Sequence, residues 1–243
     1  MPMLKSMQTH FEGGLLGADL CSELVSRGIQ HFRIAAGECT LTDCFNMLAE
    51  ADNAGADHLI ILNSVGILKE IYDRNVEWMN EPNGQVTDAS YHKWFMKAYE
   101  VCKKNNNLLH GPCINNLSKD ALRWLKSFMR FGVPDDVIIT YHHYTPGAFF
   151  EQSWEGFDSR DDEMRALLDI ADGRNIACSE SGYNEPNESL QAHNVTKELE
   201  FAEKYNLLFW TYFQLNNDTN LDLHFGARRP DGSWKPVMDC FSS

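Results

Sequence analysis

The segment NVEWMNEPN, residues 75–83, joins an apolar run to a polar tripeptide. The run at 75–80 has the length and composition of a buried strand, and the helical pattern DASYHKWFMKAYEVCKK follows it at 88–104. A strand that leads into a helix is the repeating unit of α/β proteins. Glu81 lies where the predicted strand ends, so this segment combines a fold signal with a reactive side chain.

The same unit recurs along the whole chain. Further apolar runs, each predicting a strand, lie at 5–11, 30–36, 57–63, 107–112, 136–144, 175–181 and 207–215. Helical patterns lie between them at 18–28, 41–55, 66–73, 118–132, 161–173 and 189–205, and a last short helix is expected near Pro236. Eight such units in 243 residues predict a compact (β/α)8 TIM barrel of class α/β that forms one domain over residues 1–243. A doubly wound open sheet is the alternative.

Composition and charge limit the partners of the protein. With 43% hydrophobic and 23% charged residues the chain is expected to fold, and its net charge of −14 disfavours nucleic acids and anionic membranes. No apolar stretch approaches the roughly 20 residues that cross a bilayer. We therefore expect a monomer that binds a neutral poly- or oligosaccharide, with neither nucleic acid nor membrane as a partner.

Neither a cofactor nor a compartment is indicated. The seven cysteines form no CxxC pair, so we expect no zinc module, and no cofactor or metal is predicted. The first residues lack the plan of a signal peptide. The protein therefore acts where it is made, or it is secreted after loss of a leader, and the localisation stays open.

Reactive residues cluster at the predicted strand ends. Active sites of (β/α)8 barrels lie at the carboxyl ends of the strands, whatever the reaction. Candidates at these ends are Arg33, Asn80, Glu81, His142, Tyr144, Glu180 and Trp210. Two carboxyl groups that flank one bond are what glycoside hydrolysis requires, because one must donate a proton while the other stays ionised. Glu81 and Glu180, at the ends of strands four and seven, could form such a pair.

These motifs resemble those of clan A of the glycoside hydrolases, including families 5 and 39. The similar features are NEP at 80–82, H-x-Y at 142–144, SESG at 179–182 and a tryptophan in the eighth strand, in this order along the chain. The resemblance covers the chain from about residue 5 to the tail. It departs from many family 5 enzymes in the third strand, which ends at Asn63 where they have histidine. The clan consists of retaining enzymes on (β/α)8 barrels.

The resemblance also implies a role for each candidate. Glu81 would be the acid/base and Glu180 the nucleophile, with Arg33 and Tyr144 supporting Glu180. Asn80 would bind the sugar 2-hydroxyl, His142 would correspond to the sixth-strand histidine, and Trp210 would form the floor of the −1 subsite. The compact barrel predicts a shallow cleft suited to internal cleavage of a β-linked chain, as in a β-glucanase or β-mannanase.

Several alternatives remain at the level of sequence. Arg33 could be a purely structural ion-pair partner, and either His142 or His143 must face away from the site because strand residues alternate. Trp154, Glu12, Glu38 and His110 could line subsites or serve packing and solvation. Two rival functions are a metal-dependent hydrolase or sugar isomerase, with Glu81, Glu180 and His142 as ligands, and a carbohydrate-binding barrel without catalysis.

Overall fold

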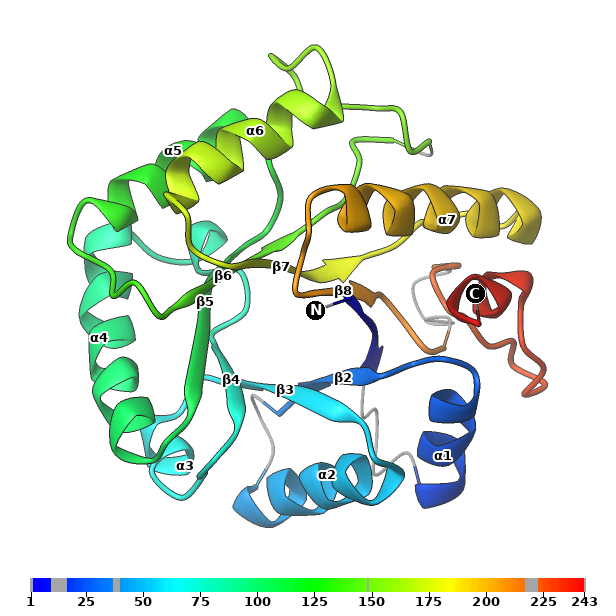
Figure 1. Cartoon of the computed structure of the whole chain (residues 1–243), viewed down its shortest axis with the longest axis horizontal. Coiled ribbons are helices and arrows are strands. Elements are labelled where there is room, and N and C mark those ends of the chain that lie inside the picture. Colours follow the sequence, from blue (N-terminus) through cyan, green and yellow to red (C-terminus); the bar gives the residue numbers. More distant parts are fainter. Residues whose placement is uncertain (1, 10–16, 37–39, 148, 217–222, 243) are drawn as a thin grey trace.

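Eight parallel strands close into a barrel (Figure 1). The computed structural model describes residues 2–9, 17–36, 40–147, 149–216 and 223–242. The strands follow one another around the barrel in chain order and are β1 (Leu4–Thr9), β2 (His31–Ala35), β3 (Asp57–Leu62), β4 (Asn75–Trp78), β5 (Leu108–Ile114), β6 (Ile138–His142), β7 (Ile176–Ser181) and β8 (Phe209–Tyr212). The predicted barrel and its eight strands are confirmed, and the open sheet is excluded.

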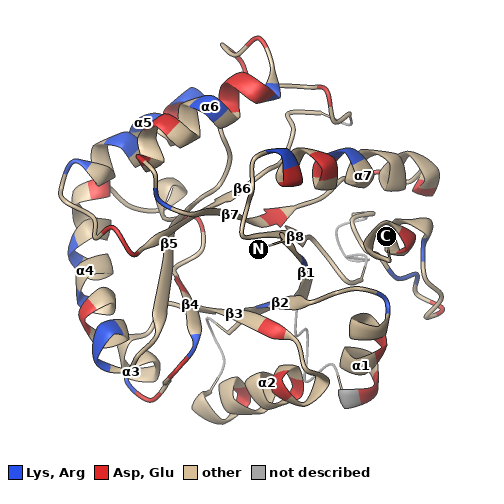
Figure 2. Ribbon diagram, in the orientation of Figure 1, with Lys and Arg blue, Asp and Glu red and all other residues tan. Residues whose placement is uncertain are grey.

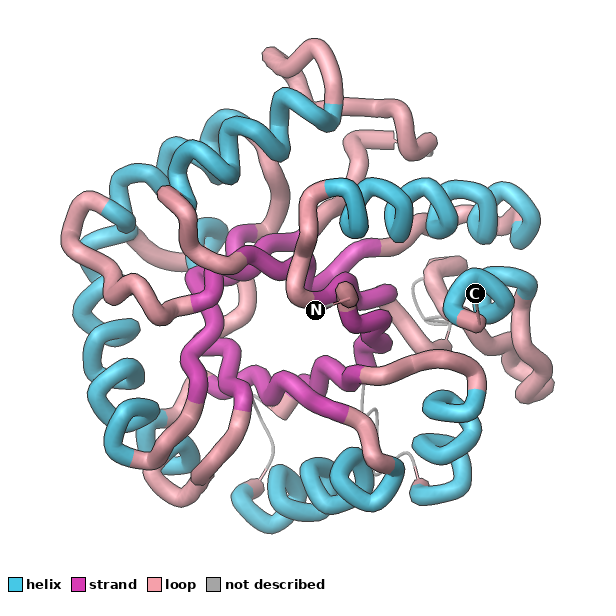
Figure 3. The backbone as a smooth tube through the Cα atoms, in the orientation of Figure 1, coloured by secondary structure: helices cyan, strands magenta, loops and turns pink. Residues whose placement is uncertain are grey.

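Helices surround the barrel (Figure 3). They are α1 (Ala18–Ser26), α2 (Leu41–Ala54), α3 (Val65–Leu68), α4 (Asp88–Lys104), α5 (Lys119–Met129), α6 (Arg160–Ala171) and α7 (Glu188–Lys204), with short 3-10 helices η1 (Pro82–Gly84) and η2 (Pro236–Phe241). The predicted helix at 66–73 is wrong beyond Leu68, where α3 ends after one turn. The final helix occurs as η2, which packs against α7 beyond β8.

Local signals place the helix ends. Thr40 accepts a hydrogen bond from the Asp43 backbone N–H, and the Asp43 side chain accepts one from the Thr40 N–H, so both free N–H groups are satisfied at the start of α2. Gly55 ends this helix at φ 73°, a left-handed conformation that glycine adopts without steric cost. The serine at 118 caps α5 by accepting from the Ala121 N–H.

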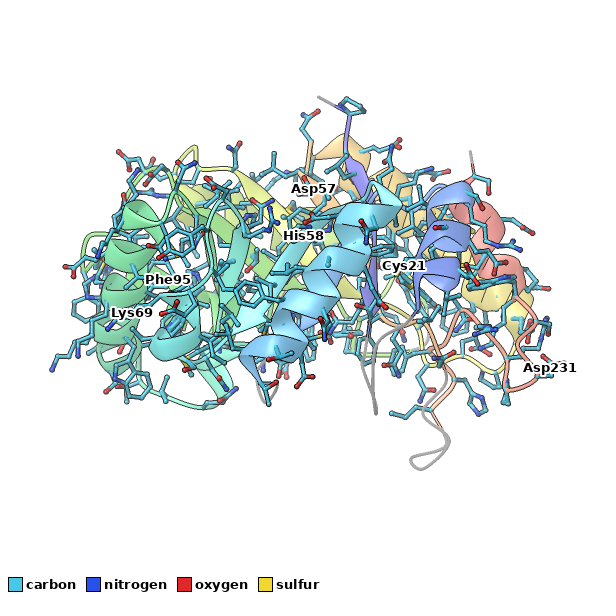
Figure 4. All side chains as sticks on the ribbon, turned by 90° about the horizontal axis from the view of Figure 1, so that it is seen from below. Cys21, Asp57, His58, Lys69, Phe95 and Asp231 are labelled. Atoms are coloured by element: carbon cyan, nitrogen blue, oxygen red, sulfur yellow. The ribbon has the colours of Figure 1, made fainter. Side chains whose placement is uncertain are left out.

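The barrel separates two apolar layers. Leu59, Ile138, Ala177 and Phe209 form a small cluster, and these residues come from β3, β6, β7 and β8, so they meet inside the barrel. The large cluster lies between the strands and the helices. In the side view of Figure 4, Phe95 of α4 belongs to this layer and is fully buried, whereas Asp231 is exposed at one edge of the molecule.

Charged residues lie mainly on the helices and connecting loops (Figure 2). Within the strands they are few, and Arg33, Glu77 and Glu180 are all buried. Burying a charge is costly unless it is paired, and Arg33 forms ion pairs with both glutamates. Among the described residues no helix has both the length and the apolarity that a membrane crossing needs.

Candidate active site

A cavity of about 450 Å³ opens at the carboxyl ends of the strands. Residues that line it are Gln8, Ala35, Ile61, Leu62, Asn63, Met79, Asn80, Glu81, Gln85, Glu180 and Phe213. Both predicted catalytic glutamates are in this set. Among the described residues of this lining, the charged side chains are those two glutamates, and the others contribute amides and apolar surface.

Glu180 is held by two donors. Arg33 Nη1 donates to Glu180 Oε2 at 2.7 Å, and Tyr144 Oη donates to Oε1 at 2.6 Å. Burial raises the pKa of this carboxyl, but the positive charges of His142 and Arg33 and the hydrogen bonds from Tyr144 and Arg33 outweigh burial and leave the pKa below its usual value. Glu180 is therefore an ionised carboxylate, with both oxygens oriented.

Glu81 has a different environment. Its side chain is 38% exposed, and its Oε1 lies 2.8 Å from His142 Nδ1. The backbone around it is unusual for non-glycine residues, because Met79 and Glu81 both have left-handed conformations, with φ of 61° and 51°. Gln85 supports this turn by donating from Nε2 to the Asn80 carbonyl oxygen at 2.6 Å. Such strain is typical of functional sites, where it directs a side chain toward a ligand.

His142 connects the two glutamates. Its Nδ1 contacts Glu81, and its Nε2 lies 3.6 Å from Glu180 Oε2 and 3.1 Å from Cys113 Sγ. Burial lowers the pKa of the imidazole, but Cys113, Glu180 and the hydrogen bond to Glu81 together raise it well above its usual value. One histidine ring thus lies in contact with both carboxyl groups.

His143 points the other way. Its Nδ1 lies 3.0 Å from Glu198 Oε2, and Arg160 Nη2 lies 2.7 Å from the same ring. Burial and the nearby Arg160 charge lower its pKa, so this imidazole is neutral. His142 is the histidine of the site, and His143 belongs to a buried network between β6, α6 and α7.

Asn80 is joined to the same group of residues. Its Oδ1 accepts from Arg33 Nη2 at 2.7 Å. The Asn80 side-chain NH2 makes no hydrogen bond to any residue in the described part of the chain. An amide oriented by its oxygen can offer its two N–H donors to a ligand hydroxyl.

Arg33 reaches three residues that the sequence interpretation did not include. Its Nε and Nη2 donate to Glu77 Oε1, the first at 3.2 Å, and its Nη1 donates to Gln8 Oε1 at 2.5 Å. Cys113 Sγ lies 3.9 Å from Nη2. A signal for Glu77 was present, because a carboxylate inside a predicted buried strand lies on the same face as Asn75 two residues earlier, toward the barrel interior.

The prediction for Trp210 is wrong. Its ring is fully buried and lies 6.1 Å from the ring of Tyr212 and 6.3 Å from that of Phe241 in η2. The neighbouring Phe209 faces the barrel interior, so alternation turns Trp210 outward, toward the helices. Phe213, four residues after Phe209, lines the cavity and is the aromatic residue of β8 and its exit that could contact a ligand.

The sequence left the roles of four further residues undecided, namely Trp154, His110, Glu12 and Glu38. Trp154 donates from Nε1 to the Tyr144 carbonyl oxygen at 3.0 Å, so it supports the backbone of a site residue. His110 lies in the barrel interior, 3.2 Å from Asn75 Oδ1 and against Phe209, rather than at the cavity. Glu12 and Glu38 lie outside the described residues. Within the described part of the chain, no group of three or more His, Cys, Asp or Glu is arranged to hold a metal ion.

Neither a protein-family model nor a curated protein sequence matches the chain significantly. Solved structures do match. A GH5-4 broad specificity endoglucanase from Clostridium longisporum has a TM-score of 0.71 at 16% identity, over 95% of this chain and 87% of its own. A GH128 exo-β-1,3-glucanase from Aureobasidium namibiae has a TM-score of 0.71 at 9% identity, over 100% of this chain and 97% of its own. A GH30 endoxylanase from Clostridium papyrosolvens has a TM-score of 0.65 at 12% identity, over 99% and 70%. At these identities the similarity establishes the fold, and this chain has the (β/α)8 barrel on which those glycoside hydrolases are built.

Proposed function

We propose that this protein is a retaining glycoside hydrolase that cleaves β-linked bonds in a neutral poly- or oligosaccharide. The observation that carries the proposal is the pair of glutamates at one cavity with unlike surroundings. Glu180 is buried and held as an anion by Arg33 and Tyr144, whereas Glu81 is partly exposed and contacts His142. An ionised carboxylate opposite a carboxyl group that can exchange protons is the arrangement that double displacement needs.

The reaction takes place in two steps. The Glu180 carboxylate attacks the anomeric carbon while the bond from that carbon to the glycosidic oxygen breaks, and Glu81 donates its proton to the departing oxygen. Glu81 then takes a proton from water, whose oxygen attacks the anomeric carbon and displaces Glu180. At the end of the cycle Glu81 is protonated again, Glu180 is an anion, and the anomeric configuration is retained.

The other cavity residues would bind and orient the sugar. The free NH2 group of Asn80 is suited to a hydroxyl next to the reacting carbon, a contact that strengthens as positive charge develops there. Phe213 offers an aromatic face to the apolar C–H surface of a sugar ring. The described lining residues include no lysine or arginine, which favours a neutral sugar over a uronate.

The mode of action is a further part of the proposal. The solved structures that match include endoglucanases and an endoxylanase, and also an exo-glucanase. We propose internal cleavage by a monomer, with a β-glucan or β-mannan as the substrate class. A panel of neutral β-linked polysaccharides with product sizes resolved tests sugar, linkage and mode together. Release of single sugars from chain ends alone would contradict internal cleavage.

Azide distinguishes the two glutamates. With an activated aryl β-glycoside and azide, Glu180→Ala should form the inverted α-glycosyl azide, because azide takes the place of the missing nucleophile. Glu81→Ala should form the retained β-glycosyl azide, because azide then attacks the glycosyl enzyme. Formation of the β-azide by Glu180→Ala would refute the assignment of roles, and an inactive wild type on the whole panel would refute the enzyme itself.

A further inference from the structure

Glu77 is a buried carboxylate just below the site. Its side chain in β4 is fully buried, and Oε1 accepts from both Nε and Nη2 of Arg33. Its other oxygen, Oε2, has no hydrogen-bond partner among the described residues. All of the hydrogen bonds that the structure gives to the Glu77 carboxylate therefore come from one guanidinium group.

That guanidinium is shared with the proposed catalytic residues. Arg33 Nη1 donates to Glu180 at 2.7 Å, and Nη2 donates to Asn80 at 2.7 Å. The guanidinium is planar and its five N–H donors have fixed directions, so holding Nε and Nη2 also sets where Nη1 points. Glu77 accepts hydrogen bonds from the Nε and Nη2 side of the guanidinium plane, and Glu180 accepts one from Nη1.

Packing alone does not explain this carboxylate. A buried ion pair is often no more stabilising than apolar residues of similar volume, because both charges lose their hydration. A buried oxygen without a hydrogen bond adds a further cost, because nothing replaces the hydration that it loses. In β4 the position lies between Val76 and Trp78, which face away from the barrel interior, and it shares its inward face with Asn75. A charge at this position therefore points to a role at the site above it.

We propose that Glu77 is a positioning residue that acts through Arg33: it orients the guanidinium toward Glu180 and Asn80 and offsets part of the positive charge that Glu180 experiences. This inference rests on the proposed function, in which Glu180 is the nucleophile. A carboxylate that faced an uncompensated guanidinium would be a weaker nucleophile, because its negative charge would be more strongly stabilised before the reaction begins.

The charges around the two carboxylates are consistent with this role. Glu180 faces Arg33 from β2, His142 from β6 and Tyr144 beyond β6. Arg33 in turn faces Glu77, Glu180 and Cys113. Burial lowers the pKa of Arg33, but Glu77, followed by Glu180, raises it above the usual value, so the guanidinium is a permanent cation between two carboxylates.

Glu77→Gln tests the inference because it keeps the shape and an acceptor oxygen but removes the charge. The measurement is the pH titration of the Glu180 carboxyl carbon by 13C NMR in the full-length protein, with its signal assigned by its loss in Glu180→Gln. The Glu180 titration should move to lower pH in Glu77→Gln. An unchanged or higher titration in the folded variant would overturn the inference. Because no substrate is needed, that result would leave the proposed glycosidase activity untouched.

Glu198→Gln is the matched control. Glu198 is also fully buried and paired with an arginine, since Arg160 Nη1 lies 2.6 Å from its Oε1, but it lies outside the site. Both variants should lower the unfolding midpoint, and only Glu77→Gln should move the Glu180 titration. An equal shift in Glu198→Gln would show that general destabilisation is the cause and would overturn the inference.

If Glu77→Gln does not fold, a second variant still tests the inference. Glu77→Asp keeps the charge but shortens the reach to Arg33, so the guanidinium should turn away from Glu180 and Asn80. We expect kcat on an aryl β-glycoside to fall with little change in KM, and activity to return with the wild-type residue. A wild-type kcat for folded Glu77→Asp would refute the positioning role.

Discussion

Replacing Trp210 by alanine should destabilise the protein without altering its cavity. The Trp210 ring is fully buried between β8 and η2, beside Tyr212 and Phe241. Truncating a buried tryptophan to alanine costs about 3–5 kcal/mol, and each kcal/mol lowers the unfolding midpoint of a domain of this size by about 2–4 °C. The midpoint should therefore fall by roughly 6–20 °C.

Phe213→Ala is the comparison that separates stability from binding. Phe213 is only partly buried and lines the cavity, so its loss should cost less stability but raise KM for the proposed saccharide substrate. The assays are thermal unfolding followed by circular dichroism, and steady-state kinetics well below the midpoint of each variant. The reasoning would be refuted if Trp210→Ala kept the wild-type midpoint and lost substrate affinity, because Trp210 would then be a ligand contact.

Two further predictions concern titration. In Tyr144→Phe the hydrogen bond to Glu180 is lost, so the acid limb of the kcat/KM profile should move to higher pH. The value of kcat/KM should fall roughly 10- to 100-fold, as expected for a charge-assisted hydrogen bond of about 1.5–3 kcal/mol. An acid limb that does not move would argue against the contact. His31 and His110 are buried against Phe209, and burial lowers the pKa of each to about 3, below the roughly 6.5 of the unfolded chain. Between these values the unfolded state binds more protons, so the free energy of unfolding should decrease as pH falls from about 6.5 toward 3. Chemical denaturation across that range checks this, and His110→Gln should flatten the dependence; an equally steep dependence in the variant would exclude His110 as a cause.

The site residues that the sequence predicted share one property. Glu81, Tyr144 and Glu180 lie at or just beyond strand ends, and the carboxyl ends of parallel barrel strands meet at one rim. Their proximity therefore follows from topology alone, once the eight apolar runs are recognised. Asn80 and His142 are brought to the same place for the same reason, and the alternation of strand residues separates His142 from His143.

The positions of the residues that were missed or misplaced depend on which face of its strand each side chain occupies and on contacts across the barrel. Trp210 and Phe213 are both aromatic residues near the end of β8, and only the register of β8 against β1 and β7 decides which of them faces the cavity. The approach of Glu77 and Gln8 to Arg33 joins three strands through the interior. No local pattern in the chain reports such a contact.

The sequence by itself determined the order of strands and helices and favoured a barrel with the two glutamates on one rim, because periodicity and turn signals are local properties of the chain. Only the tertiary structure decided the environment of each group. The ionisation of Glu180, the bridging position of His142 and the sharing of Arg33 between Glu77 and Glu180 arise from distances between residues up to 147 positions apart. Electrostatic interactions depend on separation in space and on burial, and the closed barrel sets both.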